Sequence, residues 1–298
     1  MKRYFLMVVS MVLVIVSLLS LFDNNEDVVG GAGNADNAKI TKLSEMQELL
    51  YFVGYAQDKA AFETDEEPHD SQYKSVTIYN DSYADISNNH VKLNRTMVVY
   101  KTENECYYVT KGAFIYEHIE EKNGKRIDYN YRFNFDFEML ISNYVYIKFD
   151  IFDLRMDGEA LIDISDFAGK WIKVPEQAAK EMLELLDETN ASNMKTLNYH
   201  MNNNLRNFIR KGNQYVYKDS TLRDNDTKYI IDLTDSDMPC ISLVINGNGS
   251  NGVRAYSSDK ITFANINNTV IDVNIEDAIE YTAEEFDMIF GGNLDEIG

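Results

Sequence analysis

The 14-residue stretch from Asn143 to Met156 most constrains the fold, because an apolar row alternates with a mixed row along it. Its odd positions form one apolar row: Val145, Ile147, Phe149 and Ile151. Its even positions form a mixed row: Tyr144, Tyr146, Lys148, Asp150, Phe152, Leu154 and Met156. A period of two residues predicts a β-strand. At about 3.3 Å per residue it would run about 45 Å, so it needs neighbouring strands of comparable length.

Composition and charge narrow the class of protein. A chain of 298 residues, 45% of them hydrophobic, can bury a substantial core, and we expect one β-rich domain over residues 42–298. The net charge of −21 comes from 28 basic and 49 acidic residues, without a basic cluster, and it would repel a phosphate backbone. Nucleic acid is therefore excluded as an expected partner.

The first 22 residues indicate where the protein lies in the cell. Lys2 and Arg3 precede the uncharged apolar stretch from Tyr4 to Phe22, which is 19 residues long and is followed directly by acidic residues. This length suits a membrane-spanning helix, whereas the apolar core of a cleavable signal peptide has about 7–15 residues. We expect residues 1–22 to be an uncleaved anchor, with secretion after signal cleavage as the alternative. Residues 23–41 should be a flexible linker, and the domain should lie outside the cytoplasm.

Periodicity and turn residues predict the remaining elements. A capping box at residues 44–47 opens a helix that should reach Phe62. Two more helices should begin at Pro175 and near Met194, the second ending at Gly212, and a last helix should cover 276–289. An Asn123-Gly124 hairpin lies within the first group of strands. We expect strands over 73–80, 91–100, 106–118, 126–137, 143–156, 159–164, 169–174, 214–218, 228–233, 239–245, 253–256, 260–263 and 269–273.

This order of elements resembles the LolA/LppX-like envelope proteins. The resemblance covers roughly Leu43 to Val273 and includes two short segments, Gly169 to Pro175 and Ile261 to Val273. It implies a long curved antiparallel sheet, like a half-barrel, with two or three helices covering its concave face. It also implies binding of lipids or lipoproteins. The lipobox cysteine of many exported members is missing here, and the predicted membrane helix takes its place.

The sequence contains no arrangement of residues that is typical of catalysis. Its four histidines are scattered singly, so no metal-ligand set is visible, and no glycine-rich loop that would cradle the phosphates of a cofactor is present. We therefore expect a protein that is not an enzyme and that needs no cofactor or metal. Cys106 and Cys240 lie in different predicted strands, and either two buried free thiols or a disulfide between them remains open.

Two functions remain. The first is an anchored binding protein that holds a lipid or another apolar molecule between sheet and helices; the second is a cell-envelope module that binds other proteins and has a filled core. A ligand cavity should be lined by aromatic and aliphatic residues of the long strand and of the helix before Gly212. The candidates are Tyr144, Tyr146, Phe152, Leu154, Met156, Trp171, Met194, Leu197, Met201, Leu205 and Phe208.

Overall fold

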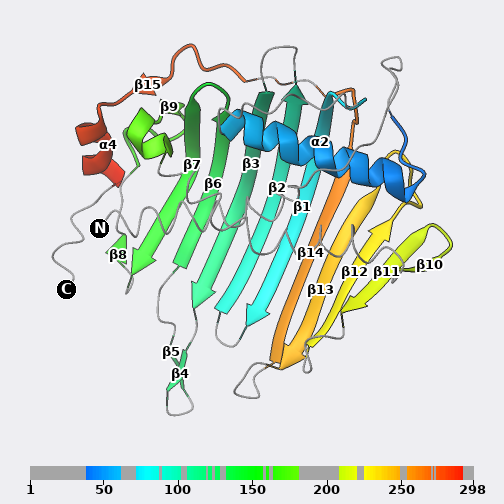
Figure 1. Ribbon diagram of the computed structural model, residues 1–298. Coiled ribbons are helices and arrows are strands. Elements are labelled where there is room, and N and C mark those ends of the chain that lie inside the picture. The colour runs from blue at the N-terminus through cyan, green and yellow to red at the C-terminus, as the bar shows by residue number, and fades with distance from the viewer. Residues whose placement is uncertain are drawn as a thin grey trace.

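The computed structural model describes most of the chain beyond residue 37 (Figure 1). The described residues are 38–61, 72–86, 89–101, 106–118, 120–122, 125–127, 132–156, 159–160, 164–180, 208–219, 225–248, 254–269, 271 and 273–290. The predicted membrane segment, residues 1–22, lies outside them, as does the predicted linker up to residue 37. Within the described part, no helix combines the length and the apolar character needed to cross a membrane.

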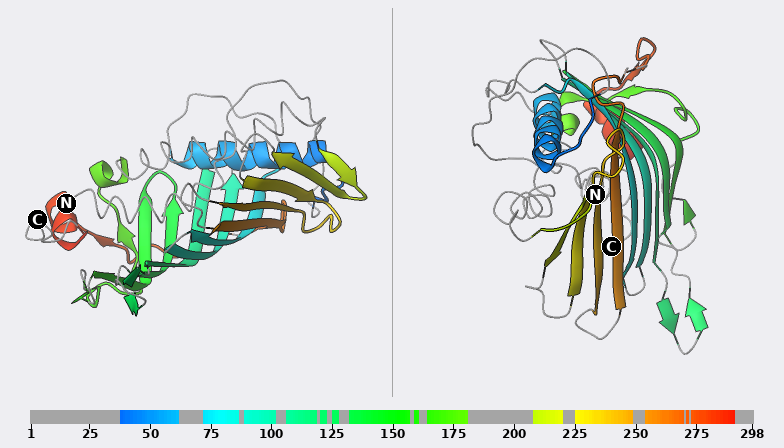
Figure 2. Two further views of the ribbon diagram at one scale, coloured as in Figure 1. Left: turned by 90° about the horizontal axis from the view of Figure 1, so that it is seen from below. Right: turned by 90° about the vertical axis from the view of Figure 1, so that its right-hand side faces the viewer.

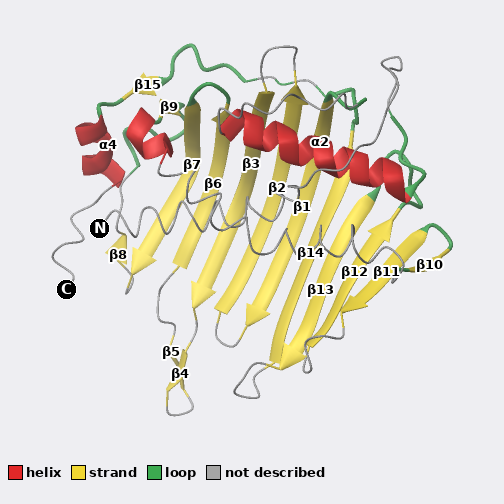
Figure 3. Cartoon of the chain, viewed as in Figure 1, coloured by secondary structure: helices red, strands yellow, loops and turns green. Residues whose placement is uncertain are grey.

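The structure is mainly β with few helices, as the alternation predicted (Figure 3). The helices are α2 (Leu43–Ala61), α4 (Ala283–Phe290) and a short helical segment at 176–180. The strands are β1 (Ser75–Ile86), β2 (Asn89–Lys101), β3 (Cys106–His118), β4 (Glu120–Lys122), β5 (Lys125–Ile127), β6 (Arg132–Ile141), β7 (Val145–Met156), β8 (Glu159–Ala160), β9 (Ile172–Lys173), β10 (Ile209–Lys211), β11 (Gln214–Asp219), β12 (Asn225–Asp232), β13 (Cys240–Asn248), β14 (Arg254–Ala264) and β15 (Ile279–Glu280).

Thirteen strands form one large sheet, in the order β10-β11-β12-β13-β14-β1-β2-β3-β6-β7-β9-β15, with β8 paired to β7. The sheet is curved, and α2 lies against its concave side (Figure 2). Strands β9 and β15 pair in parallel, so the sheet is mixed and not purely antiparallel as predicted. Strands β4 and β5 form a separate hairpin with Lys122 opposite Lys125, which confirms the hairpin predicted there.

Helix α2 begins one residue before the predicted capping box and uses a different capping residue. The Glu45 carboxylate accepts hydrogen bonds from the backbone N–H of Thr41 and of Lys42, at 2.7 and 3.0 Å. These are donors that precede the first helical turn and that the helix itself cannot satisfy. The bonds from Thr41 and Lys42 lower the pKa of Glu45, although burial acts in the opposite direction. The acidic side chain also lies at the positive end of the helix dipole.

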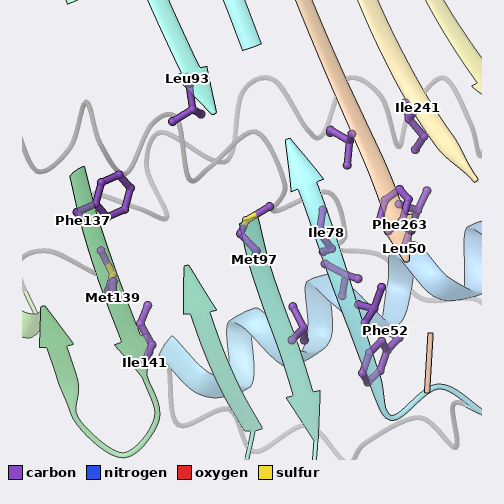
Figure 4. Close-up of a cluster of buried hydrophobic side chains, with 14 of the residues drawn as sticks. Leu50, Phe52, Ile78, Leu93, Met97, Phe137, Met139, Ile141, Ile241 and Phe263 are labelled. Atoms are coloured by element: carbon purple, nitrogen blue, oxygen red, sulfur yellow. The ribbon is translucent and has the colours of Figure 1, made fainter. Parts of the chain in front are cut away.

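The hydrophobic core lies between α2 and the concave face of the sheet (Figure 4). Leu50 and Phe52 of α2 are buried there with side chains from neighbouring strands, among them Ile78 of β1, Met97 of β2 and Phe263 of β14. Ile78 pairs with both Met97 and Phe263, so the three side chains share one face of the sheet. Burying each large apolar side chain contributes about 1.5–3 kcal/mol, so this layer is a main source of stability.

Strand β7 contains a β-bulge that the sequence pattern did not predict. Phe137 of β6 pairs with Phe149, but the adjacent Asp136 pairs with Ile151, so Asp150 is an extra residue. The bulge reverses the faces beyond it. Ile151 is 45% exposed, and Phe152 takes its place on the buried face. The prediction of one unbroken apolar row through Ile151 was therefore wrong.

Three predicted strands have other bounds in the structure. The segments 253–256 and 260–263 belong to one continuous strand, β14, because Ser257 to Asp259 pair on both sides with β13 and β1. The strand predicted over 126–137 is divided, because β5 ends at Ile127 and β6 begins at Arg132. The first prediction failed because polar residues lie within a strand, and the second because one alternating run covers parts of two strands.

Three other predictions were also wrong. Residues of β10 were assigned to the end of a helix that stops at Gly212, but Gly212, at φ 63°, is a turn residue between β10 and β11. The helix predicted over 276–289 begins only at α4, where Thr282 and Glu285 form a capping box, and β15 precedes it. The strand predicted over 269–273 is not formed at Thr269, which instead hydrogen-bonds Ser75 and Thr77 of β1.

Candidate functional site

A cluster of polar side chains interrupts the apolar concave face near the middle of the sheet. Asn80 of β1 pairs with Arg95 of β2, and Ser82 of β1 pairs with Asp259 of β14. Asn80 lies two residues beyond Ile78, and Arg95 two residues before Met97, so they point to the same side as the core. Arg95 is 3% exposed and Asp259 is 6% exposed. We call Asn80, Ser82, Arg95 and Asp259 the buried polar cluster.

Hydrogen bonds join the members of the buried polar cluster across three strands. Asn80 Nδ2 donates to Asp259 Oδ1 at 2.5 Å, and Ser82 Oγ donates to the same oxygen at 2.7 Å. Arg95 Nη2 donates to Asn80 Oδ1 at 3.4 Å. Buried polar groups need such partners, because an unsatisfied one costs about 1–3 kcal/mol. The cluster is therefore a connected network, with Asn80 between the acid and the base.

Gly112 of β3 pairs with Arg95 and so extends the cross-strand row of the buried polar cluster by one strand. A Cβ atom at position 112 would lie 2.6 Å from the Asn94 carbonyl oxygen and 3.2 Å from Arg95 Cβ. The glycine is thus required for the close approach of β2 and β3 beside the arginine. On the other side Gly112 pairs with Phe137, where the β-bulge begins, so the cluster lies next to the irregular part of the sheet.

Burial controls the charge of the acidic member of the cluster. It raises the pKa of Asp259 above the ordinary 3.8, while hydrogen bonds from Ser82 and Asn80 and the charge of Arg95 act in the opposite direction. The folded protein therefore holds this proton more tightly than the unfolded chain does. The stability that the neutral acid contributes is fully present below pH 3.8 and is lost as the pH rises through the raised pKa.

This linkage gives a pH-dependent prediction. As the pH rises above 3.8, the wild type should lose free energy of unfolding relative to Asp259→Asn. The reason is that the asparagine amide still accepts hydrogen bonds but cannot ionise. Urea unfolding of both proteins over a series of pH values measures the difference. Parallel curves would contradict a raised pKa at Asp259.

The predicted lining residues of the long strand do not share one face. Tyr146 pairs with Leu140 and Lys173, next to the inward pair of Ile147 and Ile172, so Tyr146 lies on the convex side. Tyr144 is 56% exposed and packs edge-on against Tyr146, with 6.4 Å between ring centroids. Phe152 is on the concave side because of the bulge, and its ring centroid lies 4.6 Å from that of Phe135. For Leu154 and Met156 the structure describes only the backbone of β7.

Trp171 is also on the convex side, away from the core. Lys148 Nζ lies 5.4 Å from the centre of its ring, and the same ammonium forms an ion pair with Glu138 at 2.8 Å. Lys111 Nζ of β3 lies 3.3 Å from the same Glu138 oxygen, Oε1. Although burial opposes ionisation, these hydrogen bonds lower the pKa of Glu138. Trp171 therefore belongs to a cross-strand ladder of charges and not to a lining of the concave face.

The remaining candidates fall mostly in a part of the chain that the structure leaves undescribed. This applies to Met194, Leu197, Met201 and Leu205. Phe208 is described and buried, and it stacks on Tyr217 of β11 at 5.3 Å between ring centroids. Tyr217 in turn packs against Tyr229 of β12 at 6.0 Å, so aromatic side chains line the concave face near the β10 edge.

A disulfide between Cys106 and Cys240 is not formed. Cys240 has a free thiol, and burial raises the pKa of that thiol. Cys240 begins β13 and Cys106 begins β3, with β14, β1 and β2 between them. Adjacent strands are about 4.8 Å apart, so these backbones lie far beyond the Cα separation of about 7 Å that a disulfide allows.

The described residues contain no group of three or more histidine, cysteine or acidic side chains that could hold a metal ion. Comparison with protein-family models and with curated proteins found no match. Among the described residues, the buried polar cluster is the group of hydrogen-bonded polar side chains on the concave face. Sequence reasoning missed it, although the row Val76, Ile78, Asn80, Ser82 turns from apolar to polar within one strand.

Proposed function

We propose that this chain is a membrane-anchored binding protein whose β-rich domain lies outside the cytoplasm and holds a lipid or another apolar molecule. The curved sheet would form a half-barrel, and α2 together with one or two further helices would cover its concave face. The proposal draws on the 19-residue apolar segment at the N-terminus for the anchor. The proposed binding site is the concave face of the sheet.

The observation that carries the proposal is the buried polar cluster within a mostly apolar face. A core that only stabilises the fold gains little from a buried Arg95 and Asp259, because apolar residues of similar volume are often equally or more stable there. An amphipathic ligand needs both kinds of surface. The apolar chain would lie along Leu93, Phe135 and Phe152, and its polar end would meet the cluster.

A filled core remains the second candidate, and one observation favours it. Leu93, Phe135 and Phe137 are almost completely buried by atoms of the chain itself. A face that is already covered would leave the protein to act through its outer surfaces, as an envelope module that binds other proteins. The two functions differ in whether the concave face admits a small molecule.

A binding titration distinguishes them. Full-length protein in amphipol should bind a dansyl-labelled long-chain fatty acid saturably, and Leu93→Trp should weaken binding about tenfold by occupying the concave space. Lys92→Trp is the matched control, because Lys92 is the next residue of β2 and is exposed on the convex face. A second filling variant, Thr110→Phe, tests the same concave face from β3, where Thr110 pairs with Met97. If the wild type shows no saturable binding, the filled-core function takes the place of this one.

The anchor is tested separately. We expect the full-length protein to sediment with membranes, and protease added outside cells, after removal of any cell wall, should digest everything beyond about Asp23. Immunoblotting of the membrane fraction measures both. Recovery of a shorter soluble form that begins near Asp23 would instead indicate cleavage and secretion.

A further inference from the structure

The convex face of β14 and β1 carries three exposed tyrosines on the side of the sheet opposite the core. Tyr79 and Tyr83 of β1 are 39% and 42% exposed, and Tyr256 of β14 is 41% exposed. The rings of Tyr83 and Tyr256 are neighbours, with 6.1 Å between centroids and 48° between planes. We call Tyr79, Tyr83 and Tyr256 the tyrosine platform.

The platform extends along the strand direction. Tyr79 and Tyr83 are four residues apart on β1 and therefore point to the same side at a spacing of about 13 Å. A linear molecule, but not a single small ring, can contact both ends at once. The residue between them on this face, Asp81, pairs with Asn94 and with Lys260, and the Asn94 amide donates a hydrogen bond to its carboxylate.

The charge of the platform is balanced, in contrast to that of the whole chain. The formal charges of Asp81 and Asp85 are matched by those of Lys92 and Lys260, while the chain carries −21. His90 lies 3.3 Å from Asp85 through its Nδ1 atom. A nearly neutral surface gives little attraction to a polyanion or to a polycation. It suits an uncharged ligand that hydrogen-bonds to carboxylate, amide and ammonium groups.

The surroundings of the tyrosines also argue against a protein interface at this position. Tyr79 pairs with Thr96 and Thr262, and Tyr83 pairs with Lys92 and Ser258. The centre of a protein–protein interface is depleted in charged residues and rich in apolar ones, whereas here the cross-strand partners of the three tyrosines carry hydroxyl, amide or charged groups. Flat aromatic rings between hydrogen-bonding side chains match the alternating C–H faces and hydroxyl edges of a sugar chain.

We infer that the tyrosine platform is a binding site for a neutral, extended oligosaccharide, independent of the proposed site on the concave face. The pyranose faces would stack on Tyr83 and Tyr256 at one end and on Tyr79 at the other. Asp81, Asn94 and Lys260 would hydrogen-bond to the hydroxyls between them.

Calorimetric titration of the full-length protein tests this inference, in a detergent without a sugar headgroup. The probes are cellohexaose and chitohexaose, with glucose and N-acetylglucosamine as single-ring controls. At least one hexasaccharide should bind, and the single rings should bind far more weakly because they reach only one end. Tyr83→Ala and Tyr79→Ala should each weaken hexasaccharide binding about tenfold, whereas Tyr83→Phe, which keeps the stacking ring, should change it little.

Tyr144→Ala is the matched control, because Tyr144 is an exposed tyrosine beside β7, away from the central strands that carry the platform. It should leave the affinity unchanged, and melting temperatures should show that all variants fold. Absence of binding to both hexasaccharides, or an equal loss in Tyr144→Ala, would overturn the inference. Self-association of the wild type that Tyr83→Ala abolishes would also overturn it and would assign the platform to a contact between copies. None of these results depends on fatty-acid binding.

Discussion

Leu50→Asp should lower the free energy of unfolding by about 5 kcal/mol, because it places a charge without a partner in the core and removes a buried apolar side chain. Leu50 of α2 is fully buried on the side of the helix that faces the sheet. The matched control is Ser44→Asp, an exposed position in the first turn of the same helix, which should change stability by less than about 0.5 kcal/mol. Urea denaturation followed by circular dichroism measures both. Similar stability of the two variants would mean that α2 does not cover the sheet with this face.

Asp259→Ala should cost about 3 kcal/mol, because the buried Asn80 amide and the partly buried Ser82 hydroxyl lose their common acceptor and Arg95 loses a nearby acid. Asp81→Ala provides the comparison, since Asp81 also accepts a hydrogen bond from an asparagine amide, that of Asn94, but is exposed. It should cost less than about 1 kcal/mol. Equal effects in the same denaturation assay would show that the buried polar cluster contributes nothing specific to the fold.

Much of the fold could be predicted from the period-two alternation alone. The bounds of β3 agree with the predicted strand at 106–118, and the long strand from Asn143 appears as β7. Alternation is a reliable sign here because one face of each strand packs against the core and the other meets solvent. The face assignment failed only beyond Asp150, where the bulge inserts one residue. The adjacent apolar residues Ile151 and Phe152 break the alternation at that point and could have indicated the reversal.

The candidate site could not be predicted, because its acidic residue lies among the polar residues at which the sequence pattern divided β14 into two strands. Ser257, Ser258 and Asp259 are polar and fall between the predicted strands 253–256 and 260–263, yet Asp259 is an inward residue in the middle of a strand. A polar residue in a buried row becomes tolerable only when other strands bring it partners, here Asn80 and Ser82 from a position about 180 residues earlier in the chain. A pattern within one segment contains no information about such partners.

The platform tyrosines were not singled out in the sequence for a related reason. Tyr79 lies in the predicted strand 73–80 and Tyr256 in the predicted strand 253–256, but no local feature indicates that these strands are neighbours. Pairing of β1 with β14 joins the two ends of the domain and creates both the buried polar cluster on one face and the tyrosine platform on the other. This one strand pair therefore determines the chemistry of both proposed sites.

The most direct test of the concave binding site is photocrosslinking in native membranes. Full-length protein is exposed to a phospholipid or fatty acid with a diazirine on its apolar chain, and the adducts are mapped by mass spectrometry. A bound apolar molecule should label inward residues of β2 and β6, such as Leu93 and Phe135, well above exposed neighbours such as Lys92, and excess unlabelled lipid should compete. Adducts confined to residues 1–22, with none on the inward residues, would contradict the proposed function.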